Sequence, residues 1–224
     1  MDHRPYKVKG NKTGVPCIRY ADDIVLLAKS KRASKRLLES STKYLGGKLK
    51  LTVNREKSRT VSVFAIRNFK FLGFALGRNG SGIYVRVHAK SWKKFKSKLK
   101  GLFSRRSVQS IKPNLEKIKV YARGWLNYYG IASMKDNIED INGWLYHRIR
   151  MCIWKQWKKP RIKVRNLIKM GVPEDLAWQT GNSLRGHWFT THTVTVNMPM
   201  TKERLISSGF YDLATTYQSV HVNY

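Results

Sequence analysis

The sequence predicts an α+β fold, in which antiparallel β hairpins with one helix are followed by a helical bundle and a small irregular C-terminal region. Two patterns predict this order. Up to residue 87, short apolar runs are separated by turn residues such as Gly and Asn, which is typical of hairpins. From residue 88, apolar residues recur every three or four positions over longer stretches, which is typical of amphipathic helices.

Residues 15–28 predict the first hairpin, because apolar runs precede and follow the segment Tyr20-Ala-Asp-Asp23. A helix is expected next. Ser30 and Ser34 are both candidate N-caps for it, and Gly46-Gly47 would end it.

Alternating apolar and polar residues then predict strands over 49–53 and 60–64, on either side of a polar turn. A second hairpin is expected from Phe69 to Val87. Its turn would be Asn79-Gly-Ser-Gly82, which is a strong turn signal.

A three-helix bundle is expected over residues 90–158. The first helix would be capped by Ser91, and its apolar face would lie opposite a row of lysines. Pro113-Asn114 would open the second helix, and residues 136–157 predict the third.

The C-terminal region gives weaker signals. Short helices are expected near 163–170 and 174–178, and residues 201–216 are weakly helical. Trp188-Phe189 and Val194-Thr-Val196 predict short strands because β-branched and aromatic residues favour them.

The charge of the chain indicates a nucleic-acid partner. The sequence has 45 basic and 13 acidic residues, a formal net charge of +32, and 12% aromatic residues. The net charge is +15 over residues 1–87, +18 over 88–169 and −1 over 170–224, so a polyanion would contact the first three quarters. A membrane surface is the competing interpretation, and it is weaker because the basic residues are spread over many predicted elements, strands included.

Several other classes of protein are disfavoured. Cys17 and Cys152 are far apart and form no CxxC pair, which argues against a zinc finger and fits a reducing cytosol. The first residues have no apolar stretch of the kind found in signal peptides, and the longest apolar run is far too short to span a membrane.

Asp22 and Asp23 are the strongest chemical signal in the chain. They sit at a turn between two apolar strands, in a sequence with few acidic residues. Carboxylate oxygens are the ligands that Mg²⁺ prefers, together with substrate phosphates. Two metal ions held in this way can activate a 3′-oxygen and stabilise a leaving phosphate.

Four stretches in order resemble the C-terminal part of a group II intron-encoded reverse transcriptase/maturase of the bacterial type. They are Arg19-Tyr-Ala-Asp-Asp-Ile24, Leu51-Thr-Val-Asn-Arg-Glu-Lys-Ser58, Phe71-Leu-Gly-Phe74, and Gly124-Trp-Leu-Asn-Tyr-Tyr129 with Trp154-Lys-Gln-Trp157. Each motif alone is weak, and their order and spacing together are specific. The resemblance covers roughly residues 15–215.

The resemblance implies a domain order and site residues. Residues 1–88 would be part of a polymerase palm, 89–160 a helical thumb or maturase domain X, and 161–224 its C-terminal extension. The intact enzyme would be an RNA-directed DNA polymerase using Mg²⁺. The implied residues are Asp22 and Asp23 as catalytic metal ligands, Lys57 as a catalytic proton donor near the departing pyrophosphate, and Phe71, Leu72, Gly73 and Phe74 as the primer grip.

Nucleic-acid contacts are expected from several further residues. The lysines of the first bundle helix favour contact with phosphates, in a segment of high positive charge. The full set is Tyr20, Ala21, Lys93, Lys94, Lys96, Lys98, Lys100, Arg105, Arg106 and Tyr128. The aromatic residues of the bundle are expected in its core by their helical spacing, with Tyr128 as the exposed exception able to stack on RNA bases.

One departure from the family qualifies these roles. The family carries fingers and a third catalytic aspartate upstream, whereas only 19 residues precede Tyr20 and Asp2 is the sole carboxylate among them. We therefore expect the isolated chain to be inactive as a polymerase. Three hypotheses stay open: a polymerase fragment completed by a separately encoded N-terminal fragment, an RNA-binding maturase module, and an inactive remnant. Group II intron RNA, a DNA primer or target, no membrane, and a location in the bacterial cytoplasm are implied.

Overall fold

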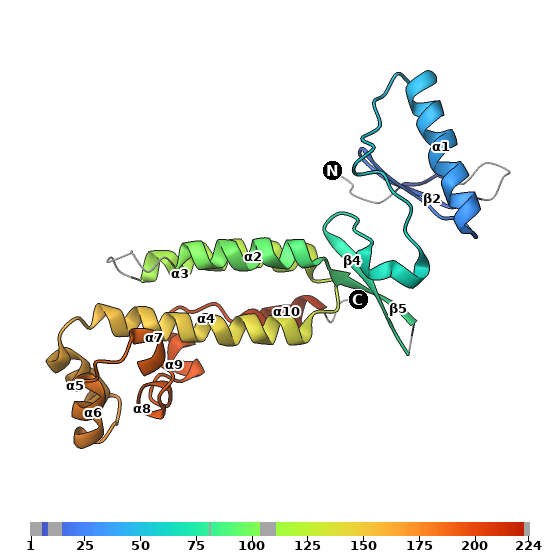
Figure 1. The fold of residues 1–224 in the computed structure, drawn as a ribbon. Coiled ribbons are helices and arrows are strands. Elements are labelled where there is room, and N and C mark those ends of the chain that lie inside the picture. The colour runs from blue at the N-terminus through green and yellow to red at the C-terminus, as the bar shows by residue number, and fades with distance from the viewer. Residues whose placement is uncertain (1–5, 9–14, 81, 104–110, 222–224) are drawn as a thin grey trace. The chain divides into compact units, whose positions relative to one another are not determined.

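A computed structural model describes residues 6–8, 15–80, 82–103 and 111–221 (Figure 1). The chain divides into two compact units, residues 1–83 and 84–224. Unit 1 is built mainly from strands, one long helix and a short 3₁₀ helix, and unit 2 is almost wholly helical, which confirms the predicted α+β class.

Unit 1 begins with a three-stranded antiparallel sheet in the order β1 (Tyr6–Val8), β2 (Cys17–Tyr20) and β3 (Asp23–Leu26). In the β2–β3 hairpin Tyr20 pairs with Asp23 next to the turn, and Cys17 pairs with Leu26 at the far end. The predicted hairpin over residues 15–28 is therefore confirmed.

Helix α1 (Lys31–Gly47) follows, and it begins and ends as its sequence predicts. The Ser30 hydroxyl accepts a hydrogen bond from the Ala33 N–H, so Ser30 rather than Ser34 is the N-cap. The helix ends at the predicted Gly46-Gly47 pair.

The predicted strand over 49–53 is wrong, because this segment terminates α1 instead. The N–H groups of Leu49 and Leu51 donate to the carbonyls of Tyr44 and Leu45 in the last turn of the helix. Lys50 has a φ of 54°, a left-handed conformation that interrupts an extended strand.

The predicted strand over 60–64 is also wrong. The Ser62 hydroxyl accepts from the Phe64 N–H and caps a short 3₁₀ helix, η1 (Val63–Asn68). A serine that bonds to the following backbone favours a turn over an extended strand.

Strand β4 (Phe74–Asn79) pairs with β5 (Gly82–Val87), the strand in which the boundary between the units falls. The second predicted hairpin is confirmed, with its first strand beginning at Phe74 rather than Phe69.

Unit 1 has almost no core of its own. Among its described residues only Ala75 and Gly77 are buried, and α1 contains no buried residue. Large apolar side chains are instead exposed, including Phe64 at 95% and Ile24 at 44%.

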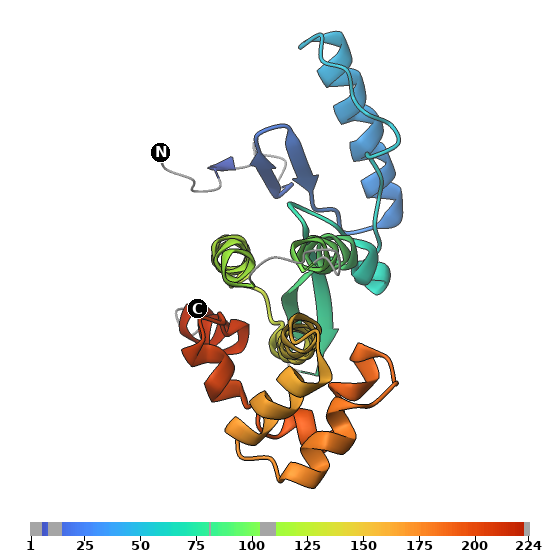
Figure 2. The same ribbon diagram turned by 90° about the vertical axis from the view of Figure 1, so that its left-hand side faces the viewer.

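Unit 2 is a bundle of α2 (Ala89–Leu102), α3 (Lys112–Tyr129), α4 (Lys135–Gln156) and the C-terminal helix α10 (Leu213–His221). Figure 2, which looks along these helices, shows the four running side by side. The three predicted bundle helices are confirmed, and α10 is a fourth that packs on α3 and α4.

The start of α2 differs from the prediction. Its N-cap is His88, whose Nδ1 accepts from the Lys90 N–H at 3.1 Å, and Ser91 lies in the first turn. Histidine is an uncommon cap, and the sequence alone favoured serine.

Between α4 and α10 the chain forms five shorter helices (Figure 1). They are α5 (Pro160–Lys169), α6 (Glu174–Gly181), α7 (His187–Thr190), α8 (Val194–Asn197) and α9 (Lys202–Ser207). The strands predicted at 188–189 and 194–196 are wrong, because both segments are single helical turns closed by the carbonyls of Gly186 and Thr193.

Polar groups fix α10 to the junction of α3 and α4. The Tyr217 hydroxyl donates to the Ala132 carbonyl at 2.9 Å and accepts from the Met134 N–H at 3.1 Å. Gly130 lies against Val220 so closely that an added Cβ would be 2.3 Å from Val220 Cγ1. This corner of the bundle is therefore closely packed.

Candidate nucleic-acid interface and metal-binding turn

The turn of the first hairpin presents both predicted metal ligands to solvent. Ala21 and Asp22 form a two-residue turn between β2 and β3, and Asp23 begins β3. Ala21 has a φ of 48°, which for a residue with a Cβ costs on the order of 1 kcal/mol. The Arg19 Nε donates to the Ala21 carbonyl at 3.0 Å and stabilises the turn.

The donor set at this turn fits part of a magnesium site. Asp22 and Asp23 are both exposed, and carboxylates of this kind bind Mg²⁺ together with water and phosphates. Among the described residues no group of three or more His, Cys, Asp or Glu side chains gathers here or elsewhere. The described part of the chain therefore offers two of the carboxylates that a two-metal site needs.

Lys57 lies in the exposed turn after α1. Its backbone N–H donates to Asn54 Oδ1 at 3.1 Å, so Asn54 shapes this turn through an Asx-type contact. The Lys57 side chain is exposed. Its proposed role toward a departing pyrophosphate stays a prediction.

The predicted primer grip is a tight two-residue turn. Phe71 and Phe74 exchange both backbone hydrogen bonds, at 3.1 and 2.8 Å. Leu72 and Gly73 have φ values of 51° and 83°, the signature of a type I′ turn. The Gly73 position therefore needs a residue that tolerates positive φ, and the turn presents its backbone at the start of β4.

Five of the six lysines of α2, between residues 93 and 100, lie on the exposed side of the helix. We call Lys93, Lys94, Lys96, Lys98 and Lys100 the α2 lysine face, and all five side chains are exposed. Phe95 and Leu99, between them in sequence, are completely buried. The Lys96 Nζ lies 5.5 Å from the centroid of the Trp144 ring, so this lysine leans toward α4.

The aromatic side chains behind this face pack α2 against α3. Trp125 stacks on Phe95 with centroids 4.0 Å apart and lies 4.9 Å from Trp92. Trp154 of α4 is buried, as predicted for the bundle core. These contacts pack α2 against α3, while the side chains of the α2 lysine face stay exposed.

Tyr128 is the exposed aromatic residue that the sequence singled out. Its side chain is 51% exposed, and its ring meets the Tyr129 ring edge-on, with the two ring centroids 4.7 Å apart. Arg105 and Arg106, which were also predicted to contact nucleic acid, lie outside the described residues.

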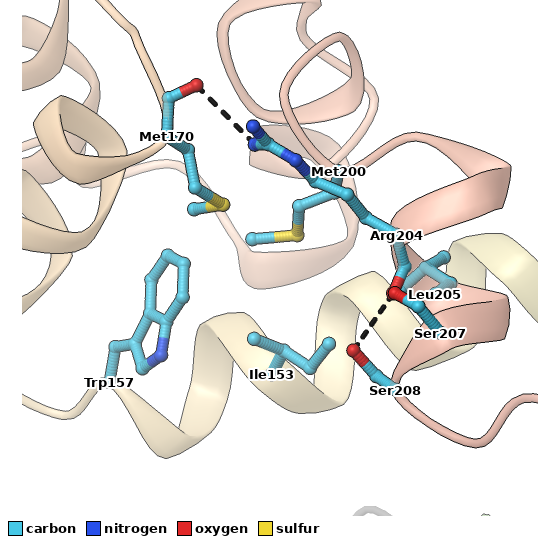
Figure 3. Close-up of a pocket in the computed structure, with 8 residues that line it drawn as sticks. All are labelled: Ile153, Trp157, Met170, Met200, Arg204, Leu205, Ser207 and Ser208. Atoms are coloured by element: carbon cyan, nitrogen blue, oxygen red, sulfur yellow. Dashed lines mark hydrogen bonds between the residues drawn. The ribbon is translucent and has the colours of Figure 1, made fainter.

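Two features of unit 2 could not be found from sequence patterns. His147 is buried beside Trp188, and its ring stacks on the ring of His192 with the two centroids 3.4 Å apart. Burial first, and the nearby His192 second, lower the pKa of His147 to about 4. An apolar pocket with Arg204 at its rim lies between α4, α5 and α9 (Figure 3). Both bring together segments about 40 to 50 residues apart, so no local signal marks them.

No helix within the described ranges combines the length and the apolar character that crossing a lipid bilayer requires.

Two family models match the chain, and together they cover most of it. The model for the reverse transcriptase (RNA-dependent DNA polymerase) matches residues 2–76, which include the Asp22-Asp23 turn and the Phe71–Phe74 turn. The model for the group II intron maturase-specific domain matches residues 92–171, from α2 through α5. No curated protein matches the chain.

The two matches follow each other in the order that the sequence motifs predicted. Unit 1 carries the polymerase match and unit 2 the maturase match. The chain therefore belongs to the group II intron reverse transcriptase/maturase family.

Proposed function

We propose that unit 2 binds the RNA of a group II intron through the α2 lysine face and assists its folding and splicing. The observation that carries this proposal is the exposure of all five side chains of the α2 lysine face, on a helix whose opposite side is buried. The maturase-specific match, which begins at residue 92, supports intron RNA as the partner.

The physical basis is release of counterions from RNA phosphates. A face with five ammonium groups over eight residues extends about 10 Å along a helix, long enough to meet more than one phosphate. Each phosphate contact makes the slope of log K against log salt steeper, by about 0.9 on a duplex and by about 0.7 on a single strand. Tyr128 adds stacking on unpaired bases.

We further propose that unit 1 carries part of a polymerase site. Asp22 and Asp23 would hold Mg²⁺, which supplies the charge that stabilises a developing alkoxide and a leaving phosphate. Lys57 would lie near the pyrophosphate, the Phe71–Phe74 turn would contact the primer, and Tyr20 and Ala21 would lie beside the primer end. The three-part division at residues 88 and 160 belongs to this proposal.

Polymerisation by this scheme needs a carboxylate from outside the described residues. The two exposed aspartates at the turn supply one carboxylate fewer than the three that the resemblance implies for a pair of Mg²⁺ ions, even where water and phosphates complete the coordination. A separately encoded N-terminal fragment of the same family, in the cytoplasm of a bacterium, would supply it. An RNA-binding module or a remnant without polymerase activity is the alternative, and the nearly absent core of unit 1 favours the remnant for that unit.

The test is RNA binding by the full chain with and without the two carboxylates. We expect Asp22→Ala and Asp23→Ala to leave the affinity for a structured intron RNA within about twofold of the parent, because the α2 lysine face does not include them. Loss of binding in these variants would contradict the proposal. In the same preparation, primer extension on an RNA template in Mg²⁺ that Asp22→Ala abolishes would show that the chain polymerises unaided.

A further inference from the structure

A pocket of about 210 Å³ opens on the surface of unit 2, at one end of α4 (Figure 3). Its walls are mostly apolar. The lining residues are Ile153, Trp157, Met170, Met200, Arg204, Leu205, Ser207 and Ser208. Sites for drug-sized ligands are typically about 300–1,000 Å³, so this pocket suits one flat ring system rather than an extended ligand.

The floor and walls are suited to a planar aromatic group. Met200 and Leu205 line the pocket and are buried, at 3% and 4% exposure. Trp157 and Met170 are partly exposed, and Figure 3 shows their side chains turned toward the same space as Ile153. An indole face and methionine sulfurs both make favourable contacts with flat rings.

Arg204 gives one side of the pocket a fixed positive charge. Its Nη1 donates to the carbonyls of Pro199 at 2.8 Å and Met170 at 3.4 Å, which anchors the guanidinium between α5 and α9. Within the described residues Nε and Nη2 donate to no acceptor, and the side chain is exposed. These donors are free to meet a base edge or a phosphate.

The charged residues next to the pocket complement a polyanion. Exposed lysines directly adjoin the lining residues: Lys158 follows Trp157, and Lys169 precedes Met170. Glu203 is the exposed acidic neighbour, next to Arg204, and Lys202 pairs with Asp212. The surroundings are therefore net positive, which complements a phosphate backbone rather than a neutral apolar peptide.

We propose that this pocket holds one unpaired base of the bound RNA, with the base against Trp157 and Met170 and with Arg204 on its edge or its phosphate. The proposal rests on RNA binding by unit 2 and adds a site that the α2 lysine face does not provide. It assigns base-dependent binding to the pocket and leaves charge-dependent binding to α2.

The test compares two RNA hairpins that differ only in their loop, one with uridines and one with abasic nucleotides. Both keep the same phosphates. Stacking of one base is worth about 1–3 kcal/mol, so the chain should bind the uridine loop roughly 5- to 150-fold more tightly. Trp157→Leu should reduce this preference at least fivefold, and Arg204→Gln should reduce it more weakly.

Trp178→Leu is the matched control. Trp178 is an exposed tryptophan of α6 that does not line the pocket, and its Nε1 donates to Glu174. It should keep the full preference for the uridine loop. An equal loss in Trp157→Leu and Trp178→Leu would overturn the pocket assignment.

A second measurement avoids the risk that Trp157→Leu disturbs the core it adjoins. The unaltered chain is irradiated with a hairpin carrying 5-iodouridine in its loop, and the cross-linked peptide is identified by mass spectrometry. Cross-links at Trp157 or Met170 support the proposal. Cross-links confined to Tyr128 or other aromatic residues overturn it.

The outcomes separate this proposal from RNA binding itself. If the chain binds both hairpins equally and with normal salt dependence, the assignment of a base to the pocket is wrong, while RNA binding by unit 2 stands. An apolar side chain of a partner protein would then be the alternative occupant of the pocket. If the chain binds neither hairpin nor intron RNA, both proposals are wrong.

Discussion

Asn142 of α4 and Asp212, just before α10, form a buried hydrogen-bonded pair: the Asn142 Nδ2 donates to Asp212 Oδ1 at 2.6 Å. The Leu213 N–H donates back to Asn142 Oδ1 at 3.2 Å, and Lys202 pairs with Asp212 Oδ2 at 2.8 Å. The residues are 70 positions apart, so this contact fixes the end of the chain to the middle of the bundle.

Asp212→Asn should destabilise unit 2 at neutral pH and flatten its response to acid. Burial raises the pKa of Asp212, but hydrogen bonds from Lys202, Thr215 and Asn142 outweigh it and the net pKa is lowered. The stabilisation is therefore present above the unfolded pKa, near 4, and lost as the pH falls through the folded pKa.

The measurement is urea unfolding of the parent and the variant at pH 7 and pH 2.5. We expect a difference of about 1–3 kcal/mol at pH 7 that shrinks at pH 2.5. A difference that is the same at both pH values would contradict the role given to the carboxylate charge.

Tyr217→Phe should destabilise the same corner without changing its shape. The hydroxyl bonds to the Ala132 carbonyl and the Met134 N–H, and both lie in a buried region. Removing it leaves two buried backbone groups unsatisfied, at a cost of about 1–3 kcal/mol. Thermal unfolding measures the effect, with Tyr128→Phe as control, since the Tyr128 ring is half exposed and its change should stay within about 0.5 kcal/mol. Equal effects would refute the assignment.

His147→Phe should remove part of the acid sensitivity of unit 2 between pH 6.5 and pH 4. Burial first, and the nearby His192 second, lower the pKa of His147 from 6.5 to about 4, so the unfolded chain binds this proton more readily. Stability contributed by neutral His147 is full above pH 6.5 and falls as the pH drops to about 4, by about 2–3 kcal/mol.

Unfolding free energies at pH 7, 5.5 and 4 check this prediction. The parent should lose more stability over this range than the variant. Some slope should remain in the variant, because burial and two lysines also lower the pKa of His187. A variant as acid-sensitive as the parent would show that His147 is not the titrating group.

Backbone amides of unit 1 should exchange with solvent far faster than those of unit 2. Among the described residues of unit 1 only Ala75 and Gly77 are buried, so local opening exposes little new apolar surface and costs little free energy. In α4, by contrast, ten residues are buried. Hydrogen exchange followed by mass spectrometry should show weak protection over α1 and strong protection over α4. Protection of α1 equal to that of α4 would contradict this picture.

Local signals in the sequence predicted the parts of the fold that depend on local contacts. The β2–β3 hairpin and the cap of α1 need only neighbouring residues: the hairpin was predicted correctly, and Ser30 was one of the two predicted cap candidates. The strand expected over 49–53 failed because Lys50 adopts a left-handed conformation that the alternation does not reveal. Val194–Asn197 forms a helical turn despite its β-branched residues, since β propensity acts only where a neighbouring strand exists.

The candidate sites also fall into two groups: those that short sequence patterns mark, and those that form only when distant segments meet in the folded chain. Asp22, Asp23 and the α2 lysines could be named as candidates from the sequence because motif and charge are properties of short segments, and their roles stay predictions. The pocket of Trp157, Met170 and Arg204 was missed because α4, α5 and α9 meet only in the folded chain. The excess of positive charge, from which RNA contact was predicted, ends near residue 169, next to the Met170 wall of the pocket.

The most direct test of RNA binding through α2 is the salt dependence of affinity for a structured intron RNA. Two full-chain variants are compared: one replaces the α2 lysine face with glutamine, and the other replaces Lys31, Arg32, Lys35, Arg36 and Lys43, five exposed basic residues of α1. Each removes five positive charges, so net charge is matched. We expect the α2 variant to reduce the magnitude of the slope of log K against log salt by about 2 to 4, and the α1 variant by less than about 1. Equal changes would show that net charge alone holds the RNA, and would contradict a dedicated α2 interface.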